Sequence, residues 1–234
     1  MKQQQFLNLA TAEEAEECFW QALQPQPNGE EQIHLENSRE RILSRNVIAK
    51  YNVPYFDRSN FDGFALRAED TFGAQETDPV YLKLNPEVLA CGEVPKKLVT
   101  PKTATTIATG GVIPRGADAV VMIENTLTIE ADESGESGIQ ILKAVVPSGG
   151  ISPAGSDIGA GEVVLRIGDR LGFRETGTLA GLGEAKVWVW RRPKVGIIST
   201  GNELIAPGGR MELGKVFDSN ATVIGHAVEE LGCE

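Results

Sequence analysis

Three loops of the sequence combine carboxylate or hydroxyl side chains with glycine, a mixture that suits the binding of an anion or a cation. The first loop, residues 54–66, carries Asp57 and Asp62. The pair Asp62-Gly63 can present a carboxylate beside open backbone, because both residue types favour turns. An Asx-type turn ahead of a strand would explain the same residues, so the local pattern leaves a structural and a functional interpretation open.

The second loop, residues 108–121, places Thr109 directly before Gly110 and Gly111. A hydroxyl next to exposed backbone amides can form a cradle for an anion. The loop has neither the lysine nor the spacing of a P-loop, so nothing in it indicates nucleotide hydrolysis by that device. Gly-Gly turns are common, and this loop alone is a weak indication of function.

The third loop contains Ser199, Thr200, Gly201 and Glu203 and follows the apolar run 194–199. A nearly continuous apolar run is typical of a parallel strand that is buried on both faces. Open α/β sheets bind their ligands at the carboxyl ends of such strands. The polar side chains of this loop would therefore face a binding crevice.

Asp218 and Asn220 lie where a helix, predicted for residues 220–231, begins. Asp218 can cap this helix or contact a ligand, and the sequence does not decide between the two roles. Gly232 is well suited to end the helix. A strand that is buried on both faces needs neighbouring strands, and one helix cannot cover its apolar surface. We therefore expect residues 192–234 to be only the truncated start of an α/β domain.

The elements ahead of the loops begin with two helices, predicted for residues 11–23 and 37–50. Thr11 and Glu14 have the spacing of a capping box at the start of the first helix. The second segment would place apolar side chains on one helical face and arginines on the other.

Between residues 53 and 146 the sequence changes to short apolar runs separated by Gly, Pro and Asp. The runs that we predict to be strands are residues 80–84, 105–108, 119–124 and 138–142. Because no helix separates them, we expect a small β-barrel or sandwich. The acidic stretch 131–138 is expected to be the solvated end of a hairpin and not a metal site.

Residues 148–191 combine both kinds of element. The predicted elements are a strand over 162–166, a helix over 174–182 and a strand over 186–190. Trp188 and Trp190 would share one face of the last strand, because side chains alternate along a strand. Packing or an interface, and not stacking on a ligand, is their expected role.

The composition excludes several function classes. Hydrophobic residues make up 41% and charged residues 24% of the 234 residues, and the net charge is −11. We therefore expect no nucleic-acid binding, which needs clustered Lys and Arg. No run reaches the roughly 18 apolar residues of a membrane span, so no membrane role is expected.

The N-terminus and the cysteines bear on localisation. The first residues lack the basic and apolar regions of a signal peptide. The three cysteines, Cys18, Cys91 and Cys233, are far apart and show no zinc spacing. This pattern argues against a disulfide framework and favours a cytoplasmic protein.

Four ordered motifs resemble those of the MoeA-type molybdenum-insertion proteins, whose relatives include a domain of gephyrin. Ser-x-x-Asp-Gly-[Tyr/Phe]-Ala matches residues 59–65, and Thr-Gly-x-x-x-Pro-x-Gly-Ala-Asp-Ala-Val-Val matches residues 109–121. Gly-x-Asp-Ile matches residues 155–158. Ser-Thr-Gly-[Asp/Asn]-Glu-Leu with a following Asp-[Thr/Ser]-Asn matches residues 199–204 and 218–220. Motifs spread along the whole chain are far more specific than any single loop.

The resemblance implies a mixed α and β, multidomain fold. We expect an elongated linking domain of helices and strands formed by residues 1–52 and 148–191, with a small β domain inserted at residues 53–147. Residues 192–234 would begin a parallel α/β, molybdopterin-binding domain. Family members are homodimers whose active cleft combines the α/β domain of one subunit with the inserted domain of the other.

The resemblance also implies a role in molybdenum cofactor biosynthesis. A molybdopterin molybdenumtransferase inserts molybdate into adenylylated molybdopterin and releases the nucleotide with a metal ion such as Mg²⁺, which prefers hard carboxylate oxygens. A molybdopterin adenylyltransferase is the expected upstream partner. By position we expect the catalytic residues to be Asp62, Thr109, Asp157 and Glu203, with Asp62 and Glu203 as metal ligands. The residues expected to bind the cofactor are Ser199, Thr200, Gly201, Asp218 and Asn220.

The sequence departs from the family pattern in three places. Where the family often has Arg-x-x-Gly-Glu-Asp, residues 152–157 read Ser-Pro-Ala-Gly-Ser-Asp, which removes a positive charge. Asn202 replaces the commoner aspartate. The segments Gly-Gly-x-Ser-x-Gly, Pro-Gly-Lys-Pro and Leu-Pro-Gly-Asn-Pro, which would form most of the pterin pocket, are expected beyond residue 234. We therefore expect this chain to be inactive by itself.

A non-catalytic dimerising or scaffolding relative of the same fold is the alternative hypothesis. The altered run at residues 152–156 favours it slightly. A generic carbohydrate- or nucleotide-binding α/β protein has little support once the four motifs are taken together.

Overall fold

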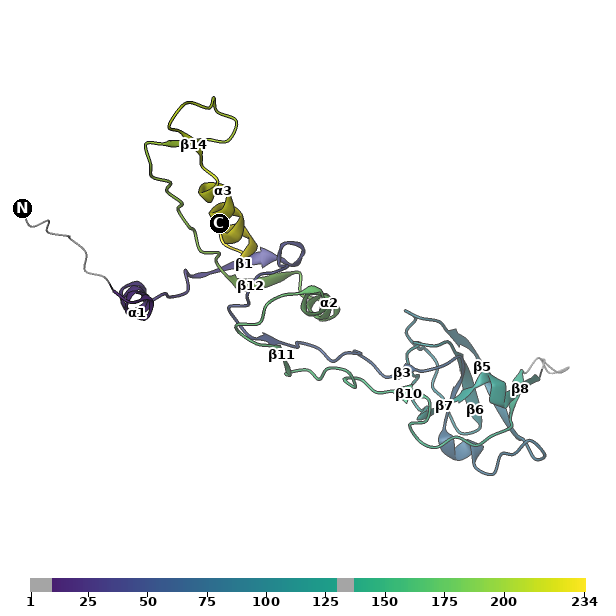
Figure 1. Ribbon diagram of the computed structural model, residues 1–234. Helices are drawn as coiled ribbons and strands as arrows, with labels where there is room; N and C mark the ends of the chain where they lie inside the picture. The colour runs from purple at the N-terminus through teal and green to yellow at the C-terminus, as the bar shows by residue number, and fades with distance from the viewer. Residues whose placement is uncertain (1–9, 130–136) are drawn as a thin grey trace, which may run out of the picture. The chain divides into compact units, whose positions relative to one another are not determined.

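The computed structural model describes residues 10–129 and 137–234. Contacts divide the chain into two compact units (Figure 1). One spans Val47–Leu165, and the other combines Met1–Asn46 with Arg166–Glu234. The mixture of helices and strands confirms the predicted fold class, whereas the finer domain boundaries stay a prediction.

The unit Val47–Leu165 is built on a six-stranded mixed sheet (Figure 1). The strand order is β7-β4-β6-β5-β9-β8, and β5 and β6 are its parallel neighbours. The strands are β4 (Gly63–Leu66), β5 (Val80–Leu89), β6 (Thr103–Ile107), β7 (Ala119–Met122), β8 (Thr126–Ile129) and β9 (Gly138–Ile141). All four predicted strands are confirmed, and β4 and β8 add to them. These strands form one sheet, and the finer expectation of a small barrel or sandwich stays a prediction.

The acidic stretch predicted to close a hairpin lies mostly outside the described residues. The strands on either side of it, β8 and β9, pair antiparallel with Ile129 opposite Gly138. Two 3₁₀ turns, η2 (Ala68–Thr71) and η3 (Ile123–Asn125), complete the connections of the sheet.

Strand β4 lies inside the sheet, where all four of its residues are buried. Phe64 and Leu66 pack in one apolar cluster with residues such as Leu82, and Ala65 packs in a second cluster with Val120. Side chains alternate along a strand, so these clusters lie on opposite faces of the sheet. The position of the motif residue Asp62, directly before β4, is therefore fixed by packing on both faces.

A two-stranded ribbon leads to the sheet within the same unit (Figure 1). Strand β2 (Val47–Ile48) pairs with β11 (Val163–Leu165), and β3 (Arg58–Ser59) pairs with β10 (Ile151–Ser152), all antiparallel. A bridge between Val53 and Ile158 lies between these two pairs. A further bridge joins Arg58 to Val112, which connects the ribbon to the second loop.

The other unit contains the antiparallel pair β1 (Glu30–His34) and β12 (Lys186–Trp190). The 3₁₀ turn η1 (Leu35–Asn37) follows β1, and helix α2 (Phe173–Gly181) precedes β12. Val187 and Val189 are buried, so Trp188 and Trp190 share the other face as predicted. The guanidinium of Arg45 lies 3.9 Å from the centre of the Trp188 ring, which is a packing role.

Helix α1 (Ala12–Leu23) begins with the predicted capping box. Thr11 accepts a hydrogen bond from the Glu14 backbone at 3.2 Å, and the Glu14 carboxylate accepts one from the Thr11 backbone at 2.9 Å. Among the helices of the described residues, none has the length and apolar character needed to cross a membrane.

The predicted helix over residues 37–50 is wrong. Leu43 instead bridges Val189 in an extended conformation, and residues 47–48 form β2. Arg41, expected on an exposed helical face, is largely buried and donates hydrogen bonds to Glu31 at 2.5 Å and to the Trp190 carbonyl at 2.8 Å. Pairing with distant strands outweighs the weak local preference for a helix.

The predicted strand over residues 194–199 is also absent from the described structure. Its Val195 N–H donates to the Glu234 carbonyl at 2.7 Å, without a ladder of strand hydrogen bonds. The parallel pair in this region is formed by β13 (Leu204–Ile205) and β14 (Val216–Phe217). Helix α3 (Asn220–Glu230) confirms the predicted helix, and Gly232 follows it with a positive φ of 80°.

Gly63 offers a direct test of the sheet. A Cβ at this position would lie 1.9 Å from the Val121 carbonyl oxygen, which belongs to the neighbouring strand. We predict that Gly63→Ala lowers the free energy of unfolding by about 1–3 kcal/mol or more, because overpacking forces the backbone to shift. Urea unfolding followed by circular dichroism measures this change.

Gly159→Ala is the matched control in the same unit. A Cβ there would have only the Glu162 carboxylate within reach, at 4.0 Å, so this variant should unfold close to the wild type. Equal stability of the two variants would contradict the close approach of β4 and β7.

Candidate functional site

Asp62 and Thr109, from the first and second motifs, are joined directly. Asp62 Oδ1 accepts a hydrogen bond from the Thr109 backbone N–H at 2.7 Å and another from the Thr109 hydroxyl at 2.9 Å. Gly63 lies opposite Ile107 in the antiparallel pair β4–β6. This register brings the residue before β4 and the loop after β6 to the same end of the sheet.

The two hydrogen bonds stabilise the ionised form of Asp62. They lower its pKa from the ordinary value, and the bond from the Thr109 backbone N–H contributes most. Both donors bind Oδ1, and among the described residues none donates to Oδ2. Asp62 is therefore an exposed, ionised carboxylate with one oxygen held and the other open to an outside ligand.

The third motif reaches the same place through the pair β3–β10. Arg58 lies opposite Ser152 in this pair. The Ser152 hydroxyl donates to Asn60 Oδ1 at 2.6 Å, and the Ala154 backbone N–H donates to Asp57 Oδ1 at 2.7 Å. Side chains of the first loop thus hold a hydroxyl and a backbone N–H of the segment that leads into the third motif.

Asp157 is placed by contacts on several sides. Its backbone N–H donates to the Val53 carbonyl at 2.9 Å, and its Oδ1 accepts a hydrogen bond from the Ser156 hydroxyl at 3.3 Å. Its Oδ2 lies 3.8 Å from Nη2 of Arg58. Asp157 therefore faces the first loop in a charge pair.

Ser59 ties the first loop to the second. Its backbone N–H donates to the Gly111 carbonyl at 3.0 Å, and its carbonyl accepts from the Gly110 N–H at 2.8 Å. Gly110 has a positive φ of 77°, which glycine adopts at little cost. Ser59 itself is buried, and its hydroxyl donates to the Phe61 carbonyl at 2.6 Å. Three of the four motifs consequently meet around β3.

The fourth motif lies in the other unit, where Ser199 and Asp218 meet. The pKa of Asp218 is lowered, first by a hydrogen bond from the Ser199 hydroxyl and then by the backbone N–H groups of Ala221 and Asn220. The Ala221 bond measures 3.0 Å and caps the first turn of α3. The capping role of Asp218 is confirmed, and a ligand contact by it stays a prediction.

Glu203, Thr200 and Gly201 lie close to this pair in sequence. Glu203 is exposed directly before β13, and its carbonyl accepts the Val216 N–H at 2.8 Å. Among the described residues no side-chain hydrogen bond links Glu203 or Thr200 to Asp218. Their assignment to the site rests on sequence alone.

The predicted site residues thus form two sets, one in each unit. In the part of the chain that the structure describes, no three His, Cys, Asp or Glu side chains are close enough to hold a metal ion. Mg²⁺ is commonly held by only one or two carboxylates, together with water and substrate phosphates. A single exposed carboxylate such as Asp62 fits that kind of site.

Sequence reasoning missed several residues that build the site. Arg58 and Asn60 were part of the first motif region but gave no local sign of their contacts with Asp157 and Ser152. Cys91 was also missed, although its thiol donates to the Thr109 carbonyl at 2.9 Å. Only the pairing of β3 with β10 and the path of β5 reveal these contacts.

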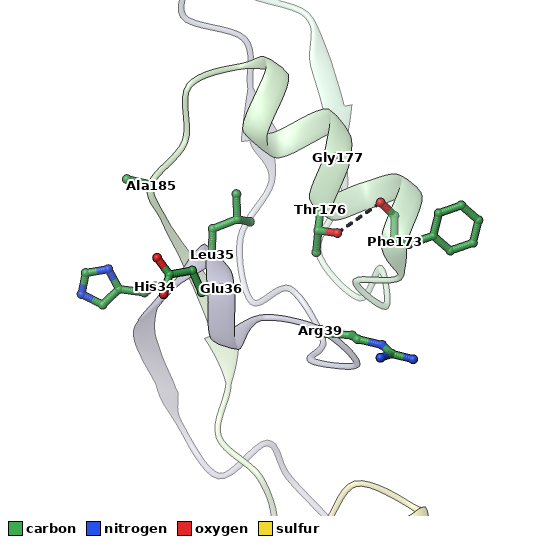
Figure 2. A pocket seen from close by; sticks show the side chains of 8 residues that line it. All are labelled: His34, Leu35, Glu36, Arg39, Phe173, Thr176, Gly177 and Ala185. Carbon is green, nitrogen blue, oxygen red and sulfur yellow. Dashed lines mark hydrogen bonds between the residues drawn. The ribbon is translucent and has the colours of Figure 1, made fainter.

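An open pocket of about 600 Å³ lies in the unit that contains α2. Its lining residues are His34, Leu35, Glu36, Arg39, Phe173, Thr176, Gly177 and Ala185 (Figure 2). None of the predicted site residues lines this pocket, and it carries no part of the candidate site.

The bond between Thr109 and Asp62 generates a testable prediction. Thr109→Val removes the hydroxyl bond at 2.9 Å and keeps the backbone bond at 2.7 Å. The pKa of Asp62 should rise in this variant but stay below its ordinary value, because the largest cause of the shift remains. A carbon-detected NMR titration of the Asp62 carboxyl group measures it.

The same titration carries a consequence for stability. Since the pKa of Asp62 is lowered in the folded state, the ionised carboxylate stabilises the fold above the unfolded pKa, and this stabilisation is lost as the pH falls through the folded value.

Thr109→Ser is the control for the titration, because it keeps the hydroxyl and should leave the Asp62 pKa unchanged. An Asp62 pKa that is the same in the valine variant and the wild type would contradict the described contact.

Comparison with known proteins adds independent information. A family model described as the MoeA N-terminal region (domain I and II) matches residues 10–183. The molybdopterin molybdenumtransferase of Bacillus subtilis (strain 168) is 42% identical over 200 residues, covering 85% of this chain and 46% of that protein. That of Staphylococcus aureus (strain Mu50) is 37% identical over 202 residues, covering 86% of this chain and 46% of that protein.

A solved structure shows the same fold. The crystal structure titled as the molybdopterin biosynthesis moea protein from Pyrococcus horikosii superposes with a TM-score of 0.83 at 37% identity. The match covers 93% of this chain and 55% of that one. The chain spans about half the length of the curated relatives that it matches. Since the family model covers most of its residues, the chain belongs to the MoeA family, in its N-terminal region of domains I and II.

Proposed function

We propose that this chain acts in molybdenum cofactor biosynthesis as part of a molybdopterin molybdenumtransferase. The reaction is the insertion of molybdate into adenylylated molybdopterin with release of the nucleotide. The observation that carries the proposal is the meeting of three motifs around β3, with Asp62 ionised and bonded to Thr109. The names of the two curated relatives reported above support it.

The proposed roles follow the two sets of residues. Asp62, Thr109 and Asp157 act at the reacting group, together with Glu203. The residues proposed to contact the cofactor are Ser199, Thr200, Gly201, Asp218 and Asn220. The bond from the Ser199 hydroxyl to Asp218 supports a common position for two members of this second set.

We propose Mg²⁺ as the metal, with Asp62 and Glu203 each offering a carboxylate. The open Oδ2 of Asp62 supports this assignment, since Mg²⁺ prefers hard oxygen ligands and keeps water and phosphate oxygens in its shell. A bound Mg²⁺ would neutralise charge on the phosphates of the substrate. Asp62 would hold its position throughout, because its other oxygen is bound by Thr109.

The proposal extends to partners and location. We propose a homodimer with a shared active cleft, a molybdopterin adenylyltransferase as upstream partner, and a cytoplasmic location. The cysteines support the location, since Cys18, Cys91 and Cys233 are all free thiols.

The altered run at residues 152–156, which lacks a positive charge, slightly favoured the scaffolding alternative. Arg58 places a guanidinium 3.8 Å from Asp157, from the opposite strand of the ribbon. The charge is thus supplied from another segment of the chain, and this observation favours the enzyme.

Asp62→Ala tests the proposed function. The chain is fused to the part of the Bacillus subtilis relative that it does not match, and the fusion is expressed in a bacterium lacking its own molybdopterin molybdenumtransferase. The wild-type fusion should restore molybdenum-dependent enzyme activity, and Asp62→Ala should abolish the rescue because its carboxylate is lost.

Asp78→Ala is the control, an exposed aspartate of the same unit that lies outside the motifs. It should rescue as well as the wild type. Full rescue by Asp62→Ala would remove Asp62 from the mechanism, and absence of rescue by the wild-type fusion would contradict the proposed function.

The homodimer gives a separate prediction. Light scattering after size-exclusion chromatography should yield about twice the chain mass of 25.1 kDa, since family members associate through a shared cleft. A mass of one chain across a concentration series would contradict the proposed dimer.

A further inference from the structure

Arg58 is not among the residues proposed above to act at the reacting group or to contact the cofactor. It belongs to β3 and lies opposite Ser152 of β10. Residues directly opposite each other in an antiparallel pair project their side chains to the same face, with Cβ atoms roughly 4.5–5.5 Å apart. The side chains of Arg58 and Ser152 therefore lie on the same face of the ribbon, although they come from different segments of the chain.

The charge pair of Arg58 leaves its donors accessible. Nη2 lies 3.8 Å from Asp157 Oδ2, which is longer than a hydrogen bond, and the two side chains are 43% and 57% exposed. Such exposed pairs contribute little to stability. Arg58 is thus held near the motif by charge, while its planar fork of N–H groups can still bind another acceptor.

The surrounding carboxylates make a cation necessary for an anionic ligand. Asp57, Asp62 and Asp157 all belong to the loops that meet around β3. Asp57 and Asp62 each accept a backbone N–H bond, so one oxygen of each carboxyl group is already bonded within the protein. An oxyanion that approached without a positive partner would be repelled by all three.

We propose that Arg58 binds a tetrahedral oxyanion of the substrate at this place, either molybdate or a phosphate of the nucleotide. A guanidinium matches the spacing of two oxygens on such a group and binds them in a fork. The choice of these anions rests on the proposed function. Arg58 supplies from β3 the positive charge that residues 152–157 do not carry.

Titration of the 234-residue chain, labelled with ¹⁵N at arginine side chains and backbone, tests this site. Sodium molybdate and AMP are added in separate titrations at constant ionic strength. The Arg58 Nε–H signal should shift saturably with at least one of them. In Arg58→Gln the affinity, followed at the Ser59 and Ser152 amides, should fall about ten-fold or more, since a bond to a charged donor is lost.

Moving the arginine to the opposite strand of the ribbon distinguishes a binding role of the guanidinium from a structural role of Arg58. Arg58→Gln combined with Ser152→Arg returns a guanidinium to the same space from the opposite strand, and most of the lost affinity should return. Arg67→Gln is the matched control, because Arg67 is also ion-paired, with Glu69, but follows the other end of β4. It should bind as the wild type does, and thermal unfolding should show that all variants are folded.

The outcomes separate this inference from the proposed function. A response to molybdate alone identifies the cargo as the ligand, a response to AMP alone identifies the nucleotide phosphate, and both results support the site. No saturable response in the wild type, or equal affinity in Arg58→Gln, would overturn the role of Arg58. Failure of the wild-type fusion to rescue cofactor maturation would overturn the proposed function and leave an Arg58-dependent binding result in place.

Discussion

The short antiparallel pairing of β3 with β10 is the contact on which the rest of the candidate site depends. It joins the first loop to the segment that carries the third motif, and the bonded side chains Asn60 and Ser152 are 92 positions apart in the sequence. Ser59, in the same strand, bonds to the second loop through both of its backbone groups. If this pairing were lost, these segments would keep their residues but not their mutual distances, because no other strand pair of residues 10–129 and 137–234 touches the first, second and third motifs together.

Much of the fold could be predicted from the sequence where local pattern and tertiary structure agree. Helix α1 follows from its capping box, and β5, β6, β7 and β9 follow from short apolar runs between turn residues. The segment 37–50 could not be predicted, because its apolar spacing suits a helix while its actual partners are distant strands such as β12. Strand β2 has only two residues, which is too short to show the alternation of apolar and polar residues that is typical of a strand.

The candidate site shows the same division. The identity of Asp62 and Thr109 could be predicted from motifs, and so could their placement at the ends of strands. Their direct bond could not, because it follows from the register of β4 against β6. The importance of Arg58 was hidden for a similar reason, since an arginine in a polar loop has no distinctive pattern until the strand opposite it is known.

The two bonds from Thr109 to a single oxygen of Asp62 have a further consequence. They fix the rotation of the carboxylate about its last torsion angle, so the direction of the second oxygen is set before any ligand arrives. A ligand that binds there finds a preorganised acceptor and loses less affinity to the ordering of a mobile side chain. Besides its proposed role at the reacting group, Thr109 can in this way raise the affinity of the site through the orientation of Asp62.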